Sequence, residues 1–394
     1  MTTAQDPLQF PARLVNLEAA QDKHGEKADH MARMLMVGDP LADAVIVEID
    51  ALGKEARRTL SRGLNDGLDS LDNPPPAIEA LLRQLETVPD WISQESLAAG
   101  DETSLLVPPR WNALAFSGGS LAHTYSSPSI AKLLVQTGKL DLMAPRRLAE
   151  TSVWKASVVL PGGLLRGGPG YVQTAQVRLL HARIRSSALK HGWDTQQWGV
   201  PINQVDIART WLDFTVVPFA FLARAGIVTN EDEQQGLYQH WWYIAHLLGL
   251  NESFFLDIGD HAAASGLLEL LDSTITPPDD NARVLVNALF DSTTDVLSSQ
   301  PNAVLTKEGA RELLNALARL YHGDARADAL GIPASTATPL LPVIAAGNAQ
   351  VRRYQTTIPE AAAQERAVNI EQYRALVDSL PGRTEYQSHA EAAK

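Results

Sequence analysis

Apolar residues recur at intervals of three and four along almost the whole chain, and this spacing constrains the fold more than any other feature. Leu41, Val45 and Ile49 are one example. The period places apolar side chains on one face of an α-helix. Alternating strand patterns are rare, and the apolar runs at 105–107 and 158–160 are too short to build a sheet. We therefore expect an all-α fold.

Glycine, proline and capping residues divide this pattern into separate helices. The triplet Gly38-Asp39-Pro40 breaks the first long helical stretch. Asp90 is a candidate N-cap for a helix over residues 91–99. Residues 203–225 are apolar enough to predict one long helix.

The length of 394 residues allows two or three average domains, or one large helical domain with extensions. We expect an N-terminal helical extension at residues 1–107, a core at 108–335, and C-terminal helices and a tail at 336–394. No internal repeat of fixed period is visible.

Charge and cysteine content exclude several classes of function. The formal net charge of −13 repels phosphate backbones and anionic membrane surfaces, so no nucleic-acid partner is expected. The absence of cysteine excludes disulfides, iron–sulfur clusters, thiolate-ligated haem and cysteine-rich zinc sites. The first residues lack the basic and apolar regions of an export signal, and no window approaches the roughly 18 apolar residues of a membrane span. We expect a cytoplasmic protein without stable membrane insertion.

Two helices predicted between residues 141 and 190 each place polar side chains on one face, so that together they can enclose a site. They are joined by a glycine-rich segment at 161–170. The polar residues that share a face are Arg147, Glu150 and Thr151 on the first helix and Arg178, His181 and Arg185 on the second.

Other candidate sites are weaker. The segment 161–170 lacks the G-x-x-x-x-G-K-[ST] order of a phosphate loop, which favours a flexible helix connection. The chain has no Glu-x-x-His motif of the kind that di-iron bundles use. Asp257 and His261 lack further metal ligands, so Asp260 is better explained as a helix cap. His240 and His246 are six residues apart and do not share a helical face, which indicates core neighbours.

His181 is the strongest candidate for a metal ligand. A neutral imidazole can bind haem iron, and Arg185, one turn away, can reach a haem propionate. The alternative is that the arginines around His181 form a solvated basic face.

Four motifs in a fixed order carry a family resemblance. They are Arg146-Arg147-Leu148-x-x-Thr151, Val177-Arg178-Leu179-x-His181-Ala182-x-x-Arg185, Gly199-x-Pro201-Ile202-Asn203-x-x-Asp206 and Ala327-Asp-Ala-Leu-Gly-Ile-Pro333. From about Trp111 to about Pro333 the chain resembles the latex-clearing proteins (rubber oxygenases) and the fungal MpaB-type oxygenases.

The resemblance implies a globin-like all-α core, at residues 108–335, that holds haem b between helices. His181 would be the proximal iron ligand and Arg185 its partnered arginine. Arg147 and Thr151 would face the haem pocket, and Arg319 is the best match to a later arginine of the family. His181 follows Arg147 by 34 residues, as in the rubber oxygenases.

Two departures from the rubber oxygenases bear on the substrate. Some of them carry a lysine that is able to bind iron at the position where this chain has Glu150. They also carry a catalytic glutamate in the region that corresponds to residues 129–137, and this region contains no acidic residue here. We therefore expect a small apolar substrate, isoprenoid or lipid-like, instead of polyisoprene. Glu150 could supply the acid or base; the alternative is an ion pair with Arg146, Arg147 or Lys155.

The resemblance thus predicts a haem b-dependent oxygenase, with dioxygen as co-substrate, that cleaves a carbon–carbon double bond to two carbonyl products. A reductant protein would be an unidentified partner. Two alternatives stay open: a haem-binding protein that serves in sensing or storage, and a cofactor-free helical interaction module.

Overall fold

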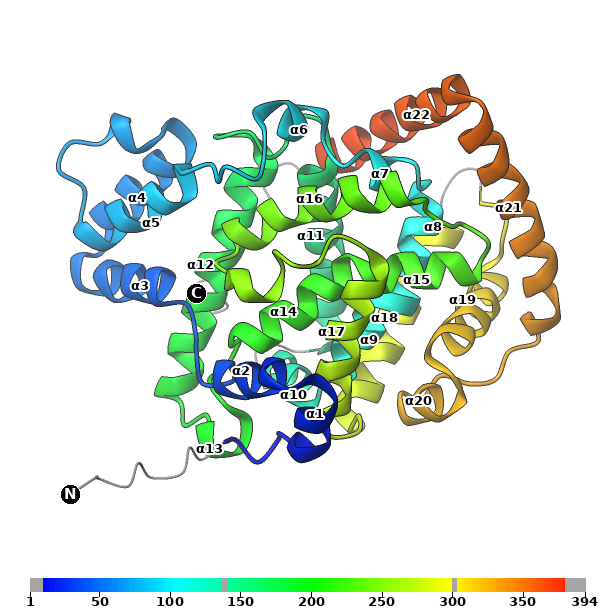
Figure 1. Ribbon diagram of the computed structural model, residues 1–394, viewed down its shortest axis with the longest axis horizontal. Coiled ribbons are helices and arrows are strands. Elements are labelled where there is room, and N and C mark those ends of the chain that lie inside the picture. The colour runs from blue at the N-terminus through cyan, green and yellow to red at the C-terminus, as the bar shows by residue number, and fades with distance from the viewer. Residues whose placement is uncertain (1–9, 137–139, 300–302, 380–394) are drawn as a thin grey trace.

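The fold is all-α, as the apolar spacing predicts. The computed structural model describes residues 10–136, 140–299 and 303–379, and in this part every regular element is helical (Figure 1). No helix among these residues is long and apolar enough to cross a bilayer.

The short helices of residues 17–105 lie along the lower, left and upper edges of the molecule as seen in Figure 1. Asp39 caps α3 by accepting a hydrogen bond from the Ala42 amide, and Pro40 occupies its first turn. The N-terminal helices are α1 (Leu17–His24), α2 (Glu26–Met34), α3 (Pro40–Leu52), α4 (Lys54–Asp66), η1 (Leu68–Ser70), α5 (Pro76–Glu86), α6 (Gln94–Ala99) and α7 (Glu102–Leu105).

Two long antiparallel helices, α11 (Leu140–Val159) and α12 (Pro169–Lys190), form the centre of the molecule. They pack closely at their glycine-rich joint, where a Cβ atom on Gly170 would lie 2.6 Å from the Ser157 carbonyl oxygen. One turn further along, the Trp154 indole donates a hydrogen bond of 3.0 Å to the Thr174 hydroxyl.

The remaining core helices surround this pair. Before α11 come α8 (Pro109–Leu114), the π-helical η2 (Ala115–Leu121), α9 (Ala122–Tyr125) and α10 (Pro128–Gln136). After α12 come α13 (Thr195–Trp198), α14 (Gln204–Phe214), α15 (Val216–Arg224), α16 (Glu231–Leu247), η3 (Glu252–Phe254), α17 (His261–Ser273), α18 (Asp280–Ser298), α19 (Lys307–His322) and α20 (Asp324–Ala329).

The C-terminal helices run along the outside of the core (Figure 1). They are η4 (Thr338–Leu340), α21 (Leu341–Thr357) and α22 (Pro359–Asp378). Helix α22 packs against α11. It is fixed to the segment before α8 by hydrogen bonds from Asn369 to the Leu105 carbonyl (2.9 Å) and from Tyr373 to the Val107 carbonyl (3.3 Å).

Two boundaries differ from the sequence-based expectation. Ser93, instead of Asp90, caps α6 by accepting from the Ser96 amide, which shortens that helix. The predicted helix at 203–225 is broken at Thr215 into α14 and α15, because Pro218 has no amide hydrogen to donate to the preceding turn.

The joint between α11 and α12 gives a first test. Gly170→Ala should lower the free energy of unfolding by about 1–3 kcal/mol, because its methyl group would collide with backbone atoms of α11. Gly236→Ala is the matched control, since this glycine is exposed on α16 with nothing within 4 Å of a Cβ. There the same change should raise stability by about 0.5–1 kcal/mol. Denaturant unfolding measures both, and equal effects would contradict the close packing.

Candidate functional site

The contacts at the joint fix the register of α11 against α12. Ser157 lies beside Gly170, and Trp154 is hydrogen-bonded to Thr174. Because both helices rise about 1.5 Å per residue in opposite directions, the position on α11 that is level with His181 is Arg147. The register thus sets Arg147 of the first motif and His181 of the second at the same level along the helix pair.

The side chains of the two helices become more exposed to solvent away from the joint. Near the joint, Trp154, Ser157 and Thr174 are buried. Beyond it the side chains keep part of their surface exposed, although several of them are apolar. These half-buried residues are Arg147, Leu148, Glu150 and Thr151 on α11 and Val177, Leu180, His181 and Ile184 on α12. This end of the helix pair therefore offers apolar and polar surface to a ligand.

His181 has the properties of a neutral ligand. Its Nδ1 atom is buried and has no hydrogen-bond partner within the described residues. Burial, assisted by the charge of Arg185, lowers the pKa of the imidazole to about 4. The ring is consequently neutral near pH 7, and a lone pair on nitrogen is available for iron.

The two arginines on the His181 face are held by aspartates of α3. Arg178 makes a bidentate pair with Asp39, with Nε–Oδ2 and Nη2–Oδ1 distances of 2.6 and 3.0 Å. Arg185 donates to Asp43 at 2.8 Å and to the Ile202 carbonyl at 2.6 Å. Both arginine side chains are at least 96% buried, since only 4% and 3% of their surface is exposed. The prediction of a solvated basic face is therefore wrong for these two residues.

The α11 side of the site contains a second set of charges. Arg147 is half-buried and donates to the Leu134 carbonyl at 3.3 Å, and burial lowers the pKa of its guanidinium. Glu150 pairs with Arg146 at 2.7 Å across one helical turn, which confirms one of its expected ion pairs. Its side chain keeps 15% of its surface exposed.

Lys155 lies one turn beyond Thr151 and has no contact with Glu150 among the interactions described. Its amine binds the Asn112 side-chain oxygen and sits 4.5 Å from the centre of the Phe116 ring. Burial lowers the pKa of this amine to about 7.

Arg319 does not lie beside His181. It is on α19, on the opposite side of the molecule from α12 (Figure 1). Its guanidinium donates to Asp324, Asp328 and the Ile332 carbonyl, at 2.6–2.7 Å. These bonds fix α20 and the turn after it, and they raise the pKa of Arg319.

The alternative metal ligands have structural roles. Asp260 caps α17 by accepting from the Ala263 amide at 2.7 Å, as predicted. His261 is hydrogen-bonded to Tyr238 (2.8 Å) and Thr229 (3.1 Å). Within the described part of the chain, no three His, Cys, Asp or Glu residues are grouped for a metal ion.

Sequence reasoning missed a buried charge network around His123. The Nδ1 atom of His123 lies 2.6 Å from Asp213, and its Nε2 atom lies 3.1 Å from Asp272. Arg209 donates to Asp272 at 2.6 Å and to the His123 carbonyl at 3.2 Å. Arg209 and Asp213 are one helical turn apart, and this spacing is the one signal of the network that the sequence contains.

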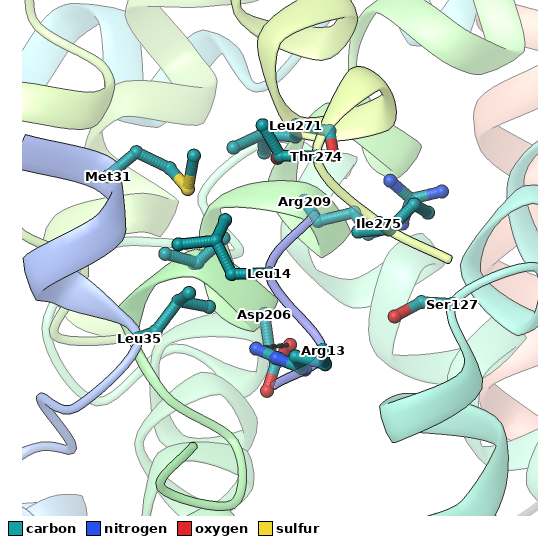
Figure 2. A pocket seen from close by; sticks show the side chains of 11 residues that line it. Arg13, Leu14, Met31, Leu35, Ser127, Asp206, Arg209, Leu271, Thr274 and Ile275 are labelled. Carbon is teal, nitrogen blue, oxygen red and sulfur yellow. Dashed lines mark hydrogen bonds and ion pairs between the residues drawn. The ribbon is translucent and has the colours of Figure 1, made fainter. Parts of the chain in front are cut away.

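Arg209 also lines a small cavity of about 20 Å³, which has room for a water molecule. Figure 2 shows the N-terminal segment with Arg13 and Leu14 passing across it, and Arg13 paired with Asp206 at 2.9 Å. None of the residues that line this cavity comes from α11 or α12.

Comparison with known proteins identifies the family. The sequence model described as "ER-bound oxygenase mpaB/B'/Rubber oxygenase, catalytic domain" matches residues 110–358, more than half of the chain. The chain belongs to this oxygenase family. The matched region contains both site helices, α11 and α12.

A curated relative and a solved structure agree with this assignment. The chain is 23% identical over 234 residues to a protein of Streptomyces sp. (strain K30) named "Rubber oxygenase". That match covers 57% of this chain and 55% of the relative, so it spans about half the length of each. The fold is similar to "Structure of Latex Clearing Protein LCP in the closed state", with a TM-score of 0.62, 18% identity and coverage of 87% and 90% of the two chains.

The lowered pKa of His181 predicts a pH dependence of stability. As the pH falls, the unfolded chain takes up the proton first, near pH 6.5, whereas the folded imidazole resists it down to about pH 4. The contribution of the neutral ring to the free energy of unfolding is therefore complete above about pH 6.5 and is lost as the pH falls from 6.5 to 4. Compared with the wild type, His181→Gln should lose less stability over this interval, by roughly 3 kcal/mol.

Unfolding of the ligand-free chain at several pH values measures this difference. His191→Gln, an exposed position at the end of the same helix, should retain the wild-type dependence. Parallel pH profiles for the wild type and His181→Gln would contradict the burial of a neutral imidazole.

Proposed function

We propose that this protein is a haem b-dependent oxygenase that cleaves a carbon–carbon double bond of a small apolar substrate, such as an isoprenoid. The observation that carries the proposal is the buried, unpartnered Nδ1 atom of a neutral His181, level with Arg147 on the facing helix. Membership of the oxygenase family supports the reaction class.

The residues between α11 and α12 fit a flat apolar group with acidic substituents. Leu148, Val177, Leu180 and Ile184 offer half-buried apolar surface on both helices. His181 would hold the iron through its imidazole. The cation of Arg147, at the same level, would bind an acidic substituent by a charge-assisted hydrogen bond.

Arg185 would act on the cofactor through its charge beside His181 and through Nη2, a buried donor without a hydrogen-bond partner among the described residues. Its Nε and Nη1 atoms already donate to Asp43 and to the Ile202 carbonyl. The Thr151 hydroxyl, on the same helix face as Arg147, would supply a further hydrogen bond in the site. The contact of Arg319 with the cofactor stays a prediction. From its position on α19, Arg319 would need to act on the cofactor through α19 and the neighbouring helices.

The chain's residues would orient the substrate and keep water away from the reacting atoms. Haem b, when bound, supplies the iron chemistry that activates dioxygen. The apolar side chains would hold the alkene and exclude water. One oxygen atom would end on each carbon of the broken double bond, which yields two carbonyl products and balances the reaction with one molecule of dioxygen.

Glu150 would hold or accept a proton at the side of the site that faces α12. Its carboxyl is mostly buried and is oriented by Arg146, so its position is fixed relative to Thr151. Such a carboxyl can serve as general acid or base.

Replacement of His181 tests the cofactor. His181→Ala should lose haem, measured as haem per chain by the pyridine haemochrome assay after purification in the presence of haem. His191→Ala, at the exposed residue directly after α12, is the matched control and should bind as much haem as the wild type. Equal haem content in His181→Ala would contradict the assignment of the ligand, and a wild type without haem would favour a cofactor-free interaction module.

Replacement of Glu150 tests the chemistry. Glu150→Gln should keep its haem but lower turnover of an isoprenoid alkene by roughly 10²-fold, because the amide cannot exchange the proton. Glu79→Gln is the matched control, since Glu79 pairs with Arg83 one turn away on the exposed face of α5. Product analysis by mass spectrometry gives the rates, and undiminished turnover would remove Glu150 from the mechanism.

A further inference from the structure

Two ion pairs with buried arginines join the N-terminal end of α3 to α12, one on each side of His181. Arg178 precedes the histidine by three residues and pairs with Asp39, and Arg185 follows it by four and pairs with Asp43. All three α12 residues share one helix face. The imidazole is therefore bracketed, along its helix, by two charge-balanced contacts to the N-terminal region.

The protein backbone leaves these arginines little freedom. A Cβ atom on Gly38 would lie 2.8 Å from the Arg185 Nε atom, and one on Gly249 would lie 2.6 Å from the Arg178 Cζ atom. Only glycine lets the chain approach the two guanidinium groups so closely. Arg178 also donates to the Gln84 side chain at 2.6 Å, which connects it to α5.

The aspartates compensate the charges of the two buried arginines. A buried arginine that loses its carboxylate keeps an uncompensated charge in a medium of low dielectric constant, and this is costly. Asp39 is itself fixed, because its carboxylate caps α3 while it binds Arg178. A displacement of α3 would therefore change both the position and the charge of the groups around His181.

We propose that Asp39 and Asp43 are positioning residues of the His181 site, which hold Arg178 and Arg185 so that α12 presents His181 in a fixed orientation and a balanced charge environment. The inference rests on the proposed function for the role of His181 as iron ligand. It extends the site to α3, which lies outside the family match at residues 110–358.

A third ion pair between the same helices provides an internal control. Asp50 of α3 pairs with Arg183 and with Lys190 of α12. The difference lies in the arginine: 29% of the Arg183 side chain is exposed but only 3% of the Arg185 side chain, whereas Asp50 (35%) and Asp43 (38%) are similarly exposed. Asp50→Asn removes a carboxylate from the same helix interface without leaving a buried charge beside His181.

The experiment compares Asp43→Asn with Asp50→Asn in the full chain. In the haem-loaded protein, Asp43→Asn should shift the iron reduction potential to more positive values, because the uncompensated Arg185 charge disfavours the ferric state. In the haem-free protein, the ¹⁵N signals of the His181 ring should move. Asp50→Asn should leave the potential and the ring signals at their wild-type values.

An unchanged potential and unchanged ring signals in Asp43→Asn, even with lowered thermal stability, would overturn the proposal and leave Asp43 a purely structural role. If Asp43→Asn does not fold, Asp43→Glu is measured in its place. The retained charge should keep the reduction potential near the wild-type value, while the longer side chain should move the ¹⁵N signals of the His181 ring. Unmoved ring signals would again overturn the proposal. A wild-type chain that binds no haem contradicts the proposed function, whereas the haem-free ring signals still decide the role of Asp43.

Discussion

The close contact between α11 and α12 at their joint determines the rest of the site. Gly170 lets α12 start directly against the carbonyl of Ser157, where any side chain would separate the two helices. From this point the register is fixed by helical rise, so that His181 and Arg147 reach the same level some three turns away. A change in this contact would shift every pair of facing residues, which makes the joint the geometric origin of the candidate site.

The segments before and after the family match support this helix pair from outside. Helix α3 holds α12 through Asp39 and Asp43, and α22 packs on α11 and is anchored to the segment before α8 by Asn369 and Tyr373. Helix α3 therefore contacts α12 on the same face as His181, and α22 packs against α11.

Local patterns predicted the helices and the residues that share a face. Apolar spacing gave the all-α fold, and the polar spacing brought Arg147, Thr151 and His181 together as candidates. Spacing cannot say which other element packs on that face. The partners of Arg178 and Arg185 lie 139 and 142 residues earlier in the chain. Asp39 stands in a triplet that the sequence analysis interpreted only as a helix break, and Asp43 follows it by one helical turn.

The same limitation explains the other differences. His123 is joined to Asp213 and Asp272 across 90 and 149 residues, so no local pattern announces the network. Arg319 was matched by motif, and its contacts to Asp324 and Asp328 are tertiary features of α19 and α20. The division of the chain into domains at residues 107 and 335 also stays a prediction. Contacts of α3 with α12 cross the first of these boundaries, and contacts of α22 with α11 cross the second.

The central claim is that the α11–α12 pair holds haem b through His181 and admits dioxygen. The most direct measurement is the visible spectrum of the full-length protein, purified in the presence of haem, before reduction, after reduction under nitrogen, and after oxygen is admitted. We expect a Soret band that shifts on reduction and shifts again with oxygen. A protein with no Soret band, or a reduced band that does not respond to oxygen, would contradict the claim.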